Sequence, residues 1–508
     1  MLSYLKTISR DVGQFLHIPG AMALLTVPIC LLWQEYFALS AFLVTALLSL
    51  ILGQLFYWLG QGAEQAQLKQ TMIVVALSWG LIPWLGAIPF LMIAHGLAPL
   101  AETAPTILYF RDVWSALFEA VSGFTSAGLS MAIRPSQLPH SLQWWRSFMQ
   151  WIGGVGVIVL MLAVLQPSTD AYRLYSAEGR EDRLGLTIGQ TVKRIWWIYG
   201  LFTVAGVMLL RVAGMTWWEA LNHAMCAIAT GGFSVTDSSI GGYGSAAKLG
   251  VILIMIFGAV SFSTHYAWLY RRRFRTLWQD SQHWLLWCLL LIGCGILLLE
   301  NYWFSGTFRW LDTSFQWVSA LTTCGFSTEP VQFWSPSGKL LLSLGMIMGA
   351  ASGSTVGGLK LGRVSILFKA VVWRFRRISL SPHEMLRYQL DNQVLSQETA
   401  YRWIESAAVL LMLWLGSIAV GIFLLIHVVP SEYTLSDIFF EVASALGSAG
   451  LSTGITGPEM NLTAKITLTA MMWMGRLEIF PVLLLLTMPV QQVWRLIWGR
   501  RKKTRSKY

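Results

Sequence analysis

The chain has 508 residues, of which 55% are hydrophobic and 12% are charged, and its mean hydropathy is +0.57. This composition excludes an ordinary soluble protein, a disordered chain and a fibrous rod, so the chain belongs in a membrane. The formal net charge of +11 does not indicate a nucleic-acid partner, because the basic residues cluster between apolar segments.

Ten apolar runs can cross a membrane, which takes about 20 residues per helix. They cover approximately residues 21–35, 38–60, 71–98, 142–165, 193–213, 246–270, 284–304, 338–372, 404–429 and 463–490. Of the 36 Lys and Arg, 27 fall in segments on one side of this topology, eight fall on the other, and Arg476 lies within the last run. The positive-inside rule therefore places both termini in the cytoplasm and makes anionic lipid a partner of that face.

The N-terminal stretch 1–10 is basic and amphipathic, and no small-residue cleavage site follows it. We expect it to be retained. The five cysteines show no CxxC spacing and mostly lie in apolar runs, so they predict packing residues and neither a disulfide framework nor a zinc site.

After the first two runs, the remaining eight form four pairs, and a shorter glycine-containing segment lies within each pair. The four segments align without gaps as FEAVSGFTSAGLS (118–130), NHAMCAIATGGFS (222–234), FQWVSALTTCGFS (315–327) and FEVASALGSAGLS (440–452). Their aligned glycines are Gly128, Gly232, Gly325 and Gly450. A fourfold internal repeat on one predicted side of the membrane is strong evidence for a shared structural unit.

About ten residues before each glycine would form a helix of roughly 15 Å, which enters the hydrocarbon but cannot cross it. The chain must turn back there, and non-helical backbone at that depth has to line protein or water. Glycine then lets carbonyl oxygens of four strands converge on a dehydrated cation. The candidate ion-binding residues are Ser126, Ala127, Gly128, Thr230, Gly231, Gly232, Thr323, Cys324, Gly325, Ser448, Ala449 and Gly450. The alternative is a set of small-residue helix-packing motifs.

The run within the third pair is too long for one span. Residues 340–373 number 34, and their middle, 349–358, holds four glycines, two serines and a threonine. Because each glycine costs about 1 kcal/mol in a helix interior, we expect a broken helix with a loop at membrane depth. A simple hinge is the alternative, and a phosphate-binding loop is disfavoured because no Gly-Lys-Ser/Thr follows.

Charged residues within the apolar segments are few. Arg476 lies about eleven residues into the last run and should face a polar interior, since a charge there costs roughly 2.5–3.5 kcal/mol on insertion scales. The alternative is a structural pair with a carboxylate other than Glu478, which cannot share its helix face. Glu119 and Glu441 stand nine residues before their glycines; we expect them near helix N-termini, where they interact with the dipole.

These features together resemble the Trk/Ktr/HKT superfamily of potassium transporters, most closely the bacterial Trk-type membrane subunit. The resemblance covers nearly the whole chain and rests on the four glycine segments and on three further motifs: WIGGVGVIVL (151–160), GAASGSTVGGLKLGR (349–363) and MWMGRLEIFP (472–481). The first and fourth segments read SAGL and the third TCGF, where the family favours threonine-rich versions.

The resemblance implies an all-α polytopic protein with four M1–P-loop–M2 repeats around a pseudo-fourfold pore, plus two extra N-terminal helices. The expected bounds are 1–66 for the extension and 67–170, 171–275, 276–380 and 381–508 for the repeats. It also implies a gate below the filter at Gly349, Ser352, Gly353, Ser354, Thr355, Gly357, Gly358 and Lys360, with Arg476 as a barrier in the pore.

The implied function is potassium uptake across the bacterial inner membrane, either down the electrochemical gradient or with a coupled ion. The implied partners are a second copy of the chain and a cytosolic nucleotide-binding regulatory subunit; potassium is the transported ion, and no organic cofactor is expected. The direct alternative is a sodium or ammonium transporter on the same scaffold. An enzyme is not expected, because no charged or His/Asp cluster marks a membrane face.

Overall fold

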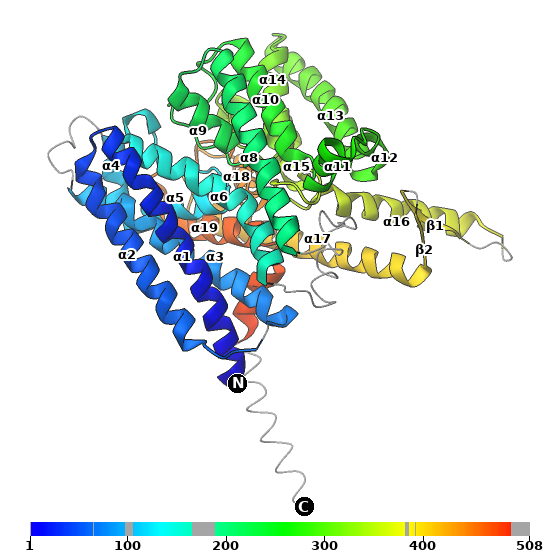
Figure 1. Ribbon diagram of the computed structural model, residues 1–508. Helices are drawn as coiled ribbons and strands as arrows, with labels where there is room; N and C mark the ends of the chain where they lie inside the picture. The colour runs from blue at the N-terminus through cyan, green and yellow to red at the C-terminus, as the bar shows by residue number, and fades with distance from the viewer. Residues whose placement is uncertain are drawn as a thin grey trace, which may run out of the picture.

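The computed structural model describes residues 2–64, 66–96, 105–164, 188–381, 386–391 and 393–488. Within these ranges almost all regular structure is helical (Figure 1). Six described helices are long and apolar enough to cross a membrane, or up to eight if each of two bent pairs counts as one span. The chain is therefore an all-α polytopic membrane protein, as predicted.

Two long helices open the chain, α1 (Leu2–Leu32) and α2 (Tyr36–Leu59), and they lie side by side at one edge of the molecule (Figure 1). Most of the predicted apolar run 21–35 lies in the C-terminal part of α1, and the basic stretch before it belongs to the same helix. Close packing on α2 extends it: the Ser9 hydroxyl donates to the Phe56 carbonyl at 2.7 Å, and Gly13 lies against the backbone of Tyr57.

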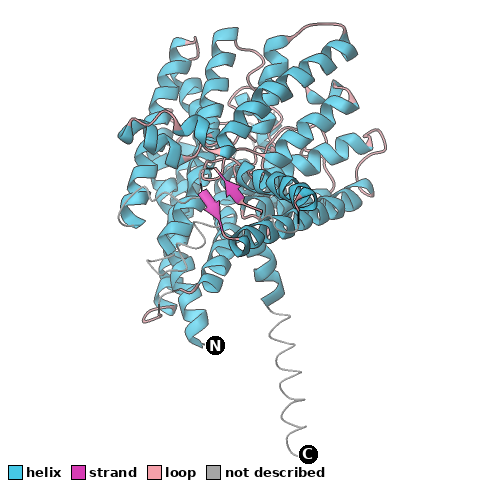
Figure 2. Ribbon diagram, turned by 90° about the vertical axis from the view of Figure 1, so that its right-hand side faces the viewer, coloured by secondary structure: helices cyan, strands magenta, loops and turns pink. Residues whose placement is uncertain are grey.

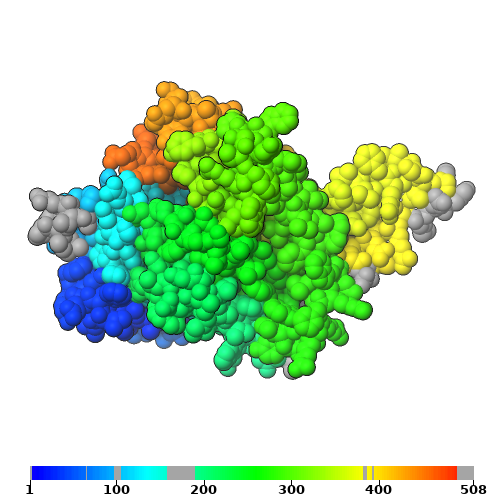
Figure 3. Space-filling view, turned by 90° about the horizontal axis from the view of Figure 1, so that it is seen from above, coloured from blue at the N-terminus to red at the C-terminus, as the bar shows by residue number. Residues whose placement is uncertain are grey.

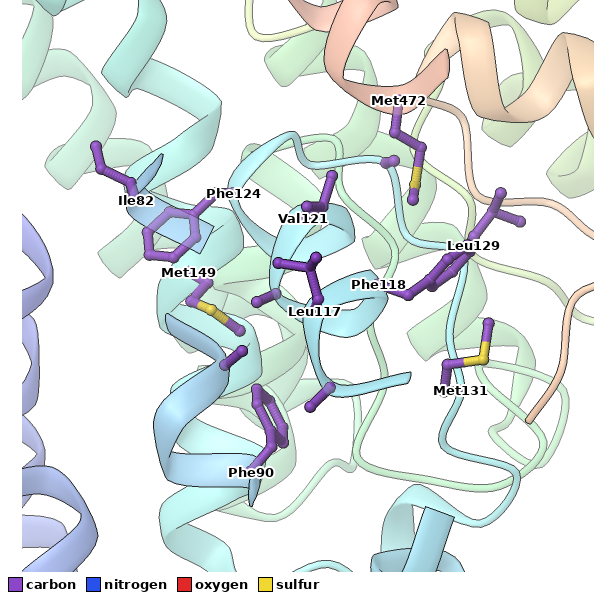
Figure 4. Close-up of a cluster of buried hydrophobic side chains, with 14 of the residues drawn as sticks. Ile82, Phe90, Leu117, Phe118, Val121, Phe124, Leu129, Met131, Met149 and Met472 are labelled. Atoms are coloured by element: carbon purple, nitrogen blue, oxygen red, sulfur yellow. The ribbon is translucent and has the colours of Figure 1, made fainter. Parts of the chain in front are cut away.

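The next helices contain the first two glycine segments. They are α3 (Leu68–Gly96), α4 (Pro105–Leu108), α5 (Val113–Phe124), α6 (His140–Val164), α8 (Ile188–Val212), α9 (Trp217–Ile228), α10 (Ser245–Ala259) and α11 (Phe262–Arg271), with short 3-10 turns at Tyr109–Arg111 and Pro135–Gln137. The α5 helix is buried on all sides. Figure 4 shows its apolar side chains beside Phe90 of α3, Met149 of α6 and Met472 near the C-terminus.

The second half contains the other two segments. Its helices are α12 (Thr276–Gln279), α13 (Ser281–Ser305), α14 (Trp310–Leu321), α15 (Pro336–Met348), α16 (Leu361–Ser379), α17 (Gln397–Ile426), α18 (Leu435–Gly447) and α19 (Leu462–Arg476), with a 3-10 turn at Val331–Phe333. A two-stranded antiparallel hairpin, β1 (Tyr388–Leu390) and β2 (Gln393–Leu395), joins α16 to α17 and was not predicted (Figure 2).

Two runs predicted to be continuous are sharply bent. The axes of α10 and α11 differ by 98°, and those of α19 and the helix Phe480–Met488 differ by 114°. Ser261 starts a new helix at the first bend, where its hydroxyl accepts from the Thr264 amide. Glu478 and Ile479 have positive φ at the second, just before Pro481, which fits the first turn of a helix. The predicted break in the third pair is present, since α15 ends at Met348 and α16 begins at Leu361.

The end of α16, the hairpin and the start of α17 project from the helical body as an arm, which is also plain from above (Figure 3). Phe368, Phe375 and Ile378 are exposed on its surface, beside Arg374 and Arg377. Of the predicted basic segments, 495–507 and the part of 173–194 up to residue 187 lie outside the described residues.

Candidate functional site

Each glycine segment ends in a turn with the same backbone geometry. We call residues 126–128, 230–232, 323–325 and 448–450 the glycine turns, numbered one to four. The first residue of every turn is a hydroxyl residue with positive φ: Ser126 at 52°, Thr230 at 50°, Thr323 at 48° and Ser448 at 52°. The glycine two positions later is also left-handed, at 86°, 78°, 89° and 83° in Gly128, Gly232, Gly325 and Gly450. A left-handed hydroxyl residue costs roughly 1–2 kcal/mol, so surrounding contacts must hold it.

The four glycine turns close into a ring. A Cβ added to Gly128 would collide with the Gly231 carbonyl oxygen of turn two, and one added to Gly232 would collide with the Cys324 carbonyl oxygen of turn three. Likewise, a Cβ on Gly325 would collide with the Ala449 carbonyl oxygen of turn four, and one on Gly450 would collide with the Ala127 carbonyl oxygen of turn one. Each turn therefore touches the next in chain order, and no side chain fits between them. All twelve predicted ion-binding residues lie in this ring.

One side chain in each glycine segment hydrogen-bonds the backbone segment that follows the glycine turn. Nine residues before the glycines stand Glu119, His223, Gln316 and Glu441, all fully buried. They hydrogen-bond the hydroxyls of Ser130, Ser234, Ser327 and Ser452, two residues after the respective glycines, at 2.8 to 2.9 Å. Four side chains of three chemical types thus make one equivalent contact.

The expectation that Glu119 and Glu441 lie near helix N-termini was wrong. Each is the seventh residue of its helix, whereas Asp112 and Thr434 are the N-caps. Glu119 also accepts from the Met131 amide and from buried Arg146, both at 2.7 Å, and Glu441 accepts from the Thr453 amide. The carboxylates are therefore saturated by hydrogen bonds, which is how a buried charge is tolerated.

A ring of polar contacts ties each short helix to the helix following the previous turn. Three contacts are ion pairs: Lys248–Asp312 and Lys339–Asp437, both at 2.6 Å, and Lys465–Asp112 at 3.0 Å. The fourth is neutral, since the Trp218 indole donates to Gln143 at 2.7 Å. Although burial acts to raise the pKa of Asp112, hydrogen bonds from Ser115 and Lys465 outweigh it and lower that pKa. Local sequence patterns do not reveal these pairs, because their partners lie 64 to 353 positions apart.

The loop between α15 and α16 is buried throughout residues 349–359 and forms hydrogen bonds with two glycine turns. The Gly357 amide donates to the Thr323 hydroxyl of turn three at 2.9 Å, and Thr230 of turn two lies 3.3 Å from the Thr355 hydroxyl. Thr355 also donates to the carbonyls of Ile228 and Gly258, at 3.0 and 3.1 Å. Of the predicted gate residues, Thr355 and Gly357 contact the glycine turns, whereas Lys360 pairs with Glu478.

Arg476 is buried and makes hydrogen bonds only to backbone carbonyls among the described residues. It donates to Thr355 at 2.8 Å, and to Gly153 and Gly154 of α6 at 2.9 and 2.7 Å. Glu478 pairs instead with Lys360 at 2.7 Å and with Arg363. The alternative of a carboxylate partner for Arg476 is therefore not observed in the described part of the chain, and the arginine bridges the loop to α6.

These features define a multi-pass membrane protein built around a ring of backbone carbonyls. In the described part of the chain, no group of three or more His, Cys, Asp or Glu side chains could hold a metal ion.

The chain matches the TrkH family, described as cation transport protein, over residues 38–301 and 305–496. It is 32% identical over 488 residues to an uncharacterized cation transporter of Methanocaldococcus jannaschii, covering 94% of this chain and 96% of that one. It is 28% identical to the Trk system potassium uptake protein TrkH of Escherichia coli K12, covering 95% and 99%. The crystal structure of the potassium transporter TrkH from Vibrio parahaemolyticus superposes with a TM-score of 0.79 at 25% identity, covering 95% and 99%. The chain belongs to the TrkH family of cation transport proteins, and it is not an enzyme.

Proposed function

We propose that this protein takes up potassium across a bacterial inner membrane through the ring of glycine turns. The observation that carries this proposal is the closed ring of four left-handed glycines. Each of them packs against a backbone carbonyl oxygen of the next turn. Carbonyl oxygens in such a ring can replace the hydration shell of a monovalent cation. Potassium is the ion favoured, because several full-length relatives are named potassium uptake proteins.

The proposed architecture is an N-terminal extension, 1–66, followed by four repeats at 67–170, 171–275, 276–380 and 381–508. Each repeat supplies one short helix and one glycine turn. The excess of Lys and Arg on one side puts both termini in the cytoplasm. Under this topology the arm formed by α16, the hairpin and α17 extends on the cytoplasmic side.

The proposed gate is the loop 349–358, which lies against turns two and three. Arg476 adds a fixed positive charge on the ion path and holds the loop through the Thr355 carbonyl. A cation passing within 4 Å of that charge would be repelled by about 4 kcal/mol at an effective dielectric near 20. The proposal takes this contact between the loop and the glycine turns as the closed position of the gate.

The proposed partners are a second copy of this chain, a cytosolic nucleotide-binding regulatory subunit and anionic lipids. The basic cytoplasmic segments supply the charge that the subunit and the lipids would recognise. Coupling to a second ion, as in a symporter, is compatible with the same pore.

The test is growth of a potassium-uptake-deficient bacterium at low potassium with this chain expressed, alone and with a candidate regulatory subunit. Proteoliposomes containing the purified protein then report rubidium, sodium and ammonium flux. Rescue of growth with rubidium flux above sodium flux supports the proposal. Faster sodium or ammonium flux without rescue would assign the protein to the alternative transporters.

A further inference from the structure

Gln150 of α6 differs from the residues at the corresponding positions of three other helices. The ring of polar contacts described above shows which positions on these helices correspond. Its members on α6, α10, α15 and α19 are Gln143, Lys248, Lys339 and Lys465. Seven residues, or about two turns, after each of them stands a fully buried side chain. These four side chains are Gln150, Met255, Met346 and Met472.

The Gln150 side chain clasps the backbone of the second glycine turn. Its amide nitrogen donates to the Gly231 carbonyl at 2.5 Å, and its amide oxygen accepts from the Phe233 amide at 3.0 Å. The two contacts lie on either side of Gly232. The orientation of the side-chain amide is fixed, because one neighbour can only accept and the other can only donate.

The fit leaves no free space. A Cβ on Gly231 would lie only 2.5 Å from the amide carbon and oxygen of Gln150. The main chain of Gln150 meanwhile meets the first turn, since its carbonyl accepts from the Ser126 hydroxyl at 3.1 Å. Gln150 therefore contacts turns one and two at the point where Gly128 abuts Gly231.

Gln150 holds the residue of turn two whose backbone has the most conformational freedom. The Gly231 residue lies between Thr230 and Gly232, which both have positive φ. Two glycines in succession leave this peptide freer to reorient than the Ala, Cys and Ala found before the glycine in turns one, three and four. A two-point hydrogen bond from a buried amide removes that freedom, and methionine cannot make it.

We propose that Gln150 is a positioning residue for ion discrimination, which holds the Gly231 carbonyl in the orientation that turn two contributes to the ring. The inference rests on the proposed function. It predicts that the selectivity of the pore depends on an amide at this position alone, whereas the other three turns reach the same geometry without one.

The experiment uses the full-length protein in proteoliposomes and measures rubidium and sodium flux through wild type, Gln150→Met and Gln150→Leu. Methionine reproduces the residue of the other three helices at similar volume. Gln70→Met is the matched control, since it makes the same change at a buried glutamine of α3 whose described hydrogen bond is with the Gln67 amide and not with a glycine turn. Loss of the clasp should lower the rubidium-to-sodium flux ratio about fivefold, which corresponds to one buried hydrogen bond. The control should keep the wild-type ratio.

Each outcome separates this inference from the proposed function. A wild-type protein without preference for rubidium would contradict the proposed function itself. A selective wild type with unchanged selectivity in both Gln150 variants would overturn the role of Gln150. That role would also be overturned if both variants fail to assemble as monodisperse protein, or if Gln70→Met loses selectivity equally, because Gln150 would then serve only folding.

Discussion

At the scale of single residues, glycine is required in the turns for two separate reasons. Gly128 and Gly325 have φ of 86° and 89°, and a Cβ on either would collide with a carbonyl of the next turn. We predict that Gly128→Ser or Gly325→Ser displaces that carbonyl and lowers rubidium-over-sodium selectivity about tenfold, which is a change of about 1.4 kcal/mol in relative binding. Ion flux in proteoliposomes measures it.

A matched control separates backbone strain from the ring. Gly306 has φ of 68°, but a Cβ there would meet nothing within 4 Å. Gly306→Ser should therefore cost some stability while keeping wild-type selectivity. Retained selectivity in both turn variants would show that the ring does not discriminate ions.

Arg476 leads to a second prediction at this scale. Its guanidinium donates to three carbonyls and faces no described carboxylate, so removing it leaves no buried anion unpaired. Arg476→Ala and Arg476→Gln should raise cation flux about tenfold or more, because both the charge barrier and the bond to the loop are lost. Arg476→Lys keeps the charge but not the forked geometry, and should have a smaller effect.

Flux is measured on purified, correctly assembled variants. An unchanged or reduced rate in Arg476→Ala and Arg476→Gln would be incompatible with the barrier. Loss of assembly in the neutral variants but not in Arg476→Lys would assign the arginine a structural role.

At the scale of elements, the loop 349–358 gives a third prediction. Thr355 hydrogen-bonds through its side chain to Ile228, Gly258 and Thr230. Thr355→Val is nearly isosteric but breaks these hydrogen bonds, at roughly 0.5–1.5 kcal/mol each. The loop should then leave the closed position more often, and resting cation flux should rise several-fold.

Thr355→Ser keeps the hydroxyl and is the control, with flux expected near the wild-type value. Deletion of the whole loop should give a larger increase than Thr355→Val if the protein reaches the membrane. A deletion variant that is assembled but shows no rise in flux would make the loop a hinge or a packing element.

The elements also show where sequence reasoning succeeds and where it stops. Glycine-rich composition predicted the break between α15 and α16, because glycine disfavours helix wherever it stands. The bends at Val260 and Glu478 were missed, since each run was taken as one span although Ser261 and Pro481 are local helix-start signals. Tertiary contacts add to these local signals: Ser261 donates its amide to the His283 ring, and Glu478 is held by Lys360 and Arg363.

The glycine turns were predictable because the signal is local and occurs four times. Their supports were not, since Gln150 and Lys465 act on residues tens to hundreds of positions away. Glu119 and Glu441 were recognised as equivalent positions, but they were wrongly expected near helix N-termini. The sequence did not show where each short helix begins, and both residues lie in the middle of their helices. The sequence thus predicted the four glycine turns but not the long-range hydrogen bonds and ion pairs that support them.

At the scale of the whole molecule, the distribution of charge predicts a cytosolic partner. The arm carries Arg374, Arg376 and Arg377 near the end of α16, all exposed. Exposed aromatic and aliphatic side chains on the same helix, such as Phe375 at 69% exposure, give the arm both charge and apolar area. A basic and apolar surface suits either an acidic protein face or the headgroup region of anionic lipid.

We predict that replacing these three arginines with glutamine abolishes co-purification of a soluble nucleotide-binding subunit, and with it any effect of nucleotide on ion flux. Basal flux should stay near wild type, because the arm lies outside the ring of glycine turns. Arg134→Gln, an exposed arginine that follows turn one, is the control and should keep the subunit. Charge removal that changes only binding to anionic vesicles, with the subunit still bound, would make the arm a lipid contact, and the regulatory partner would then dock elsewhere.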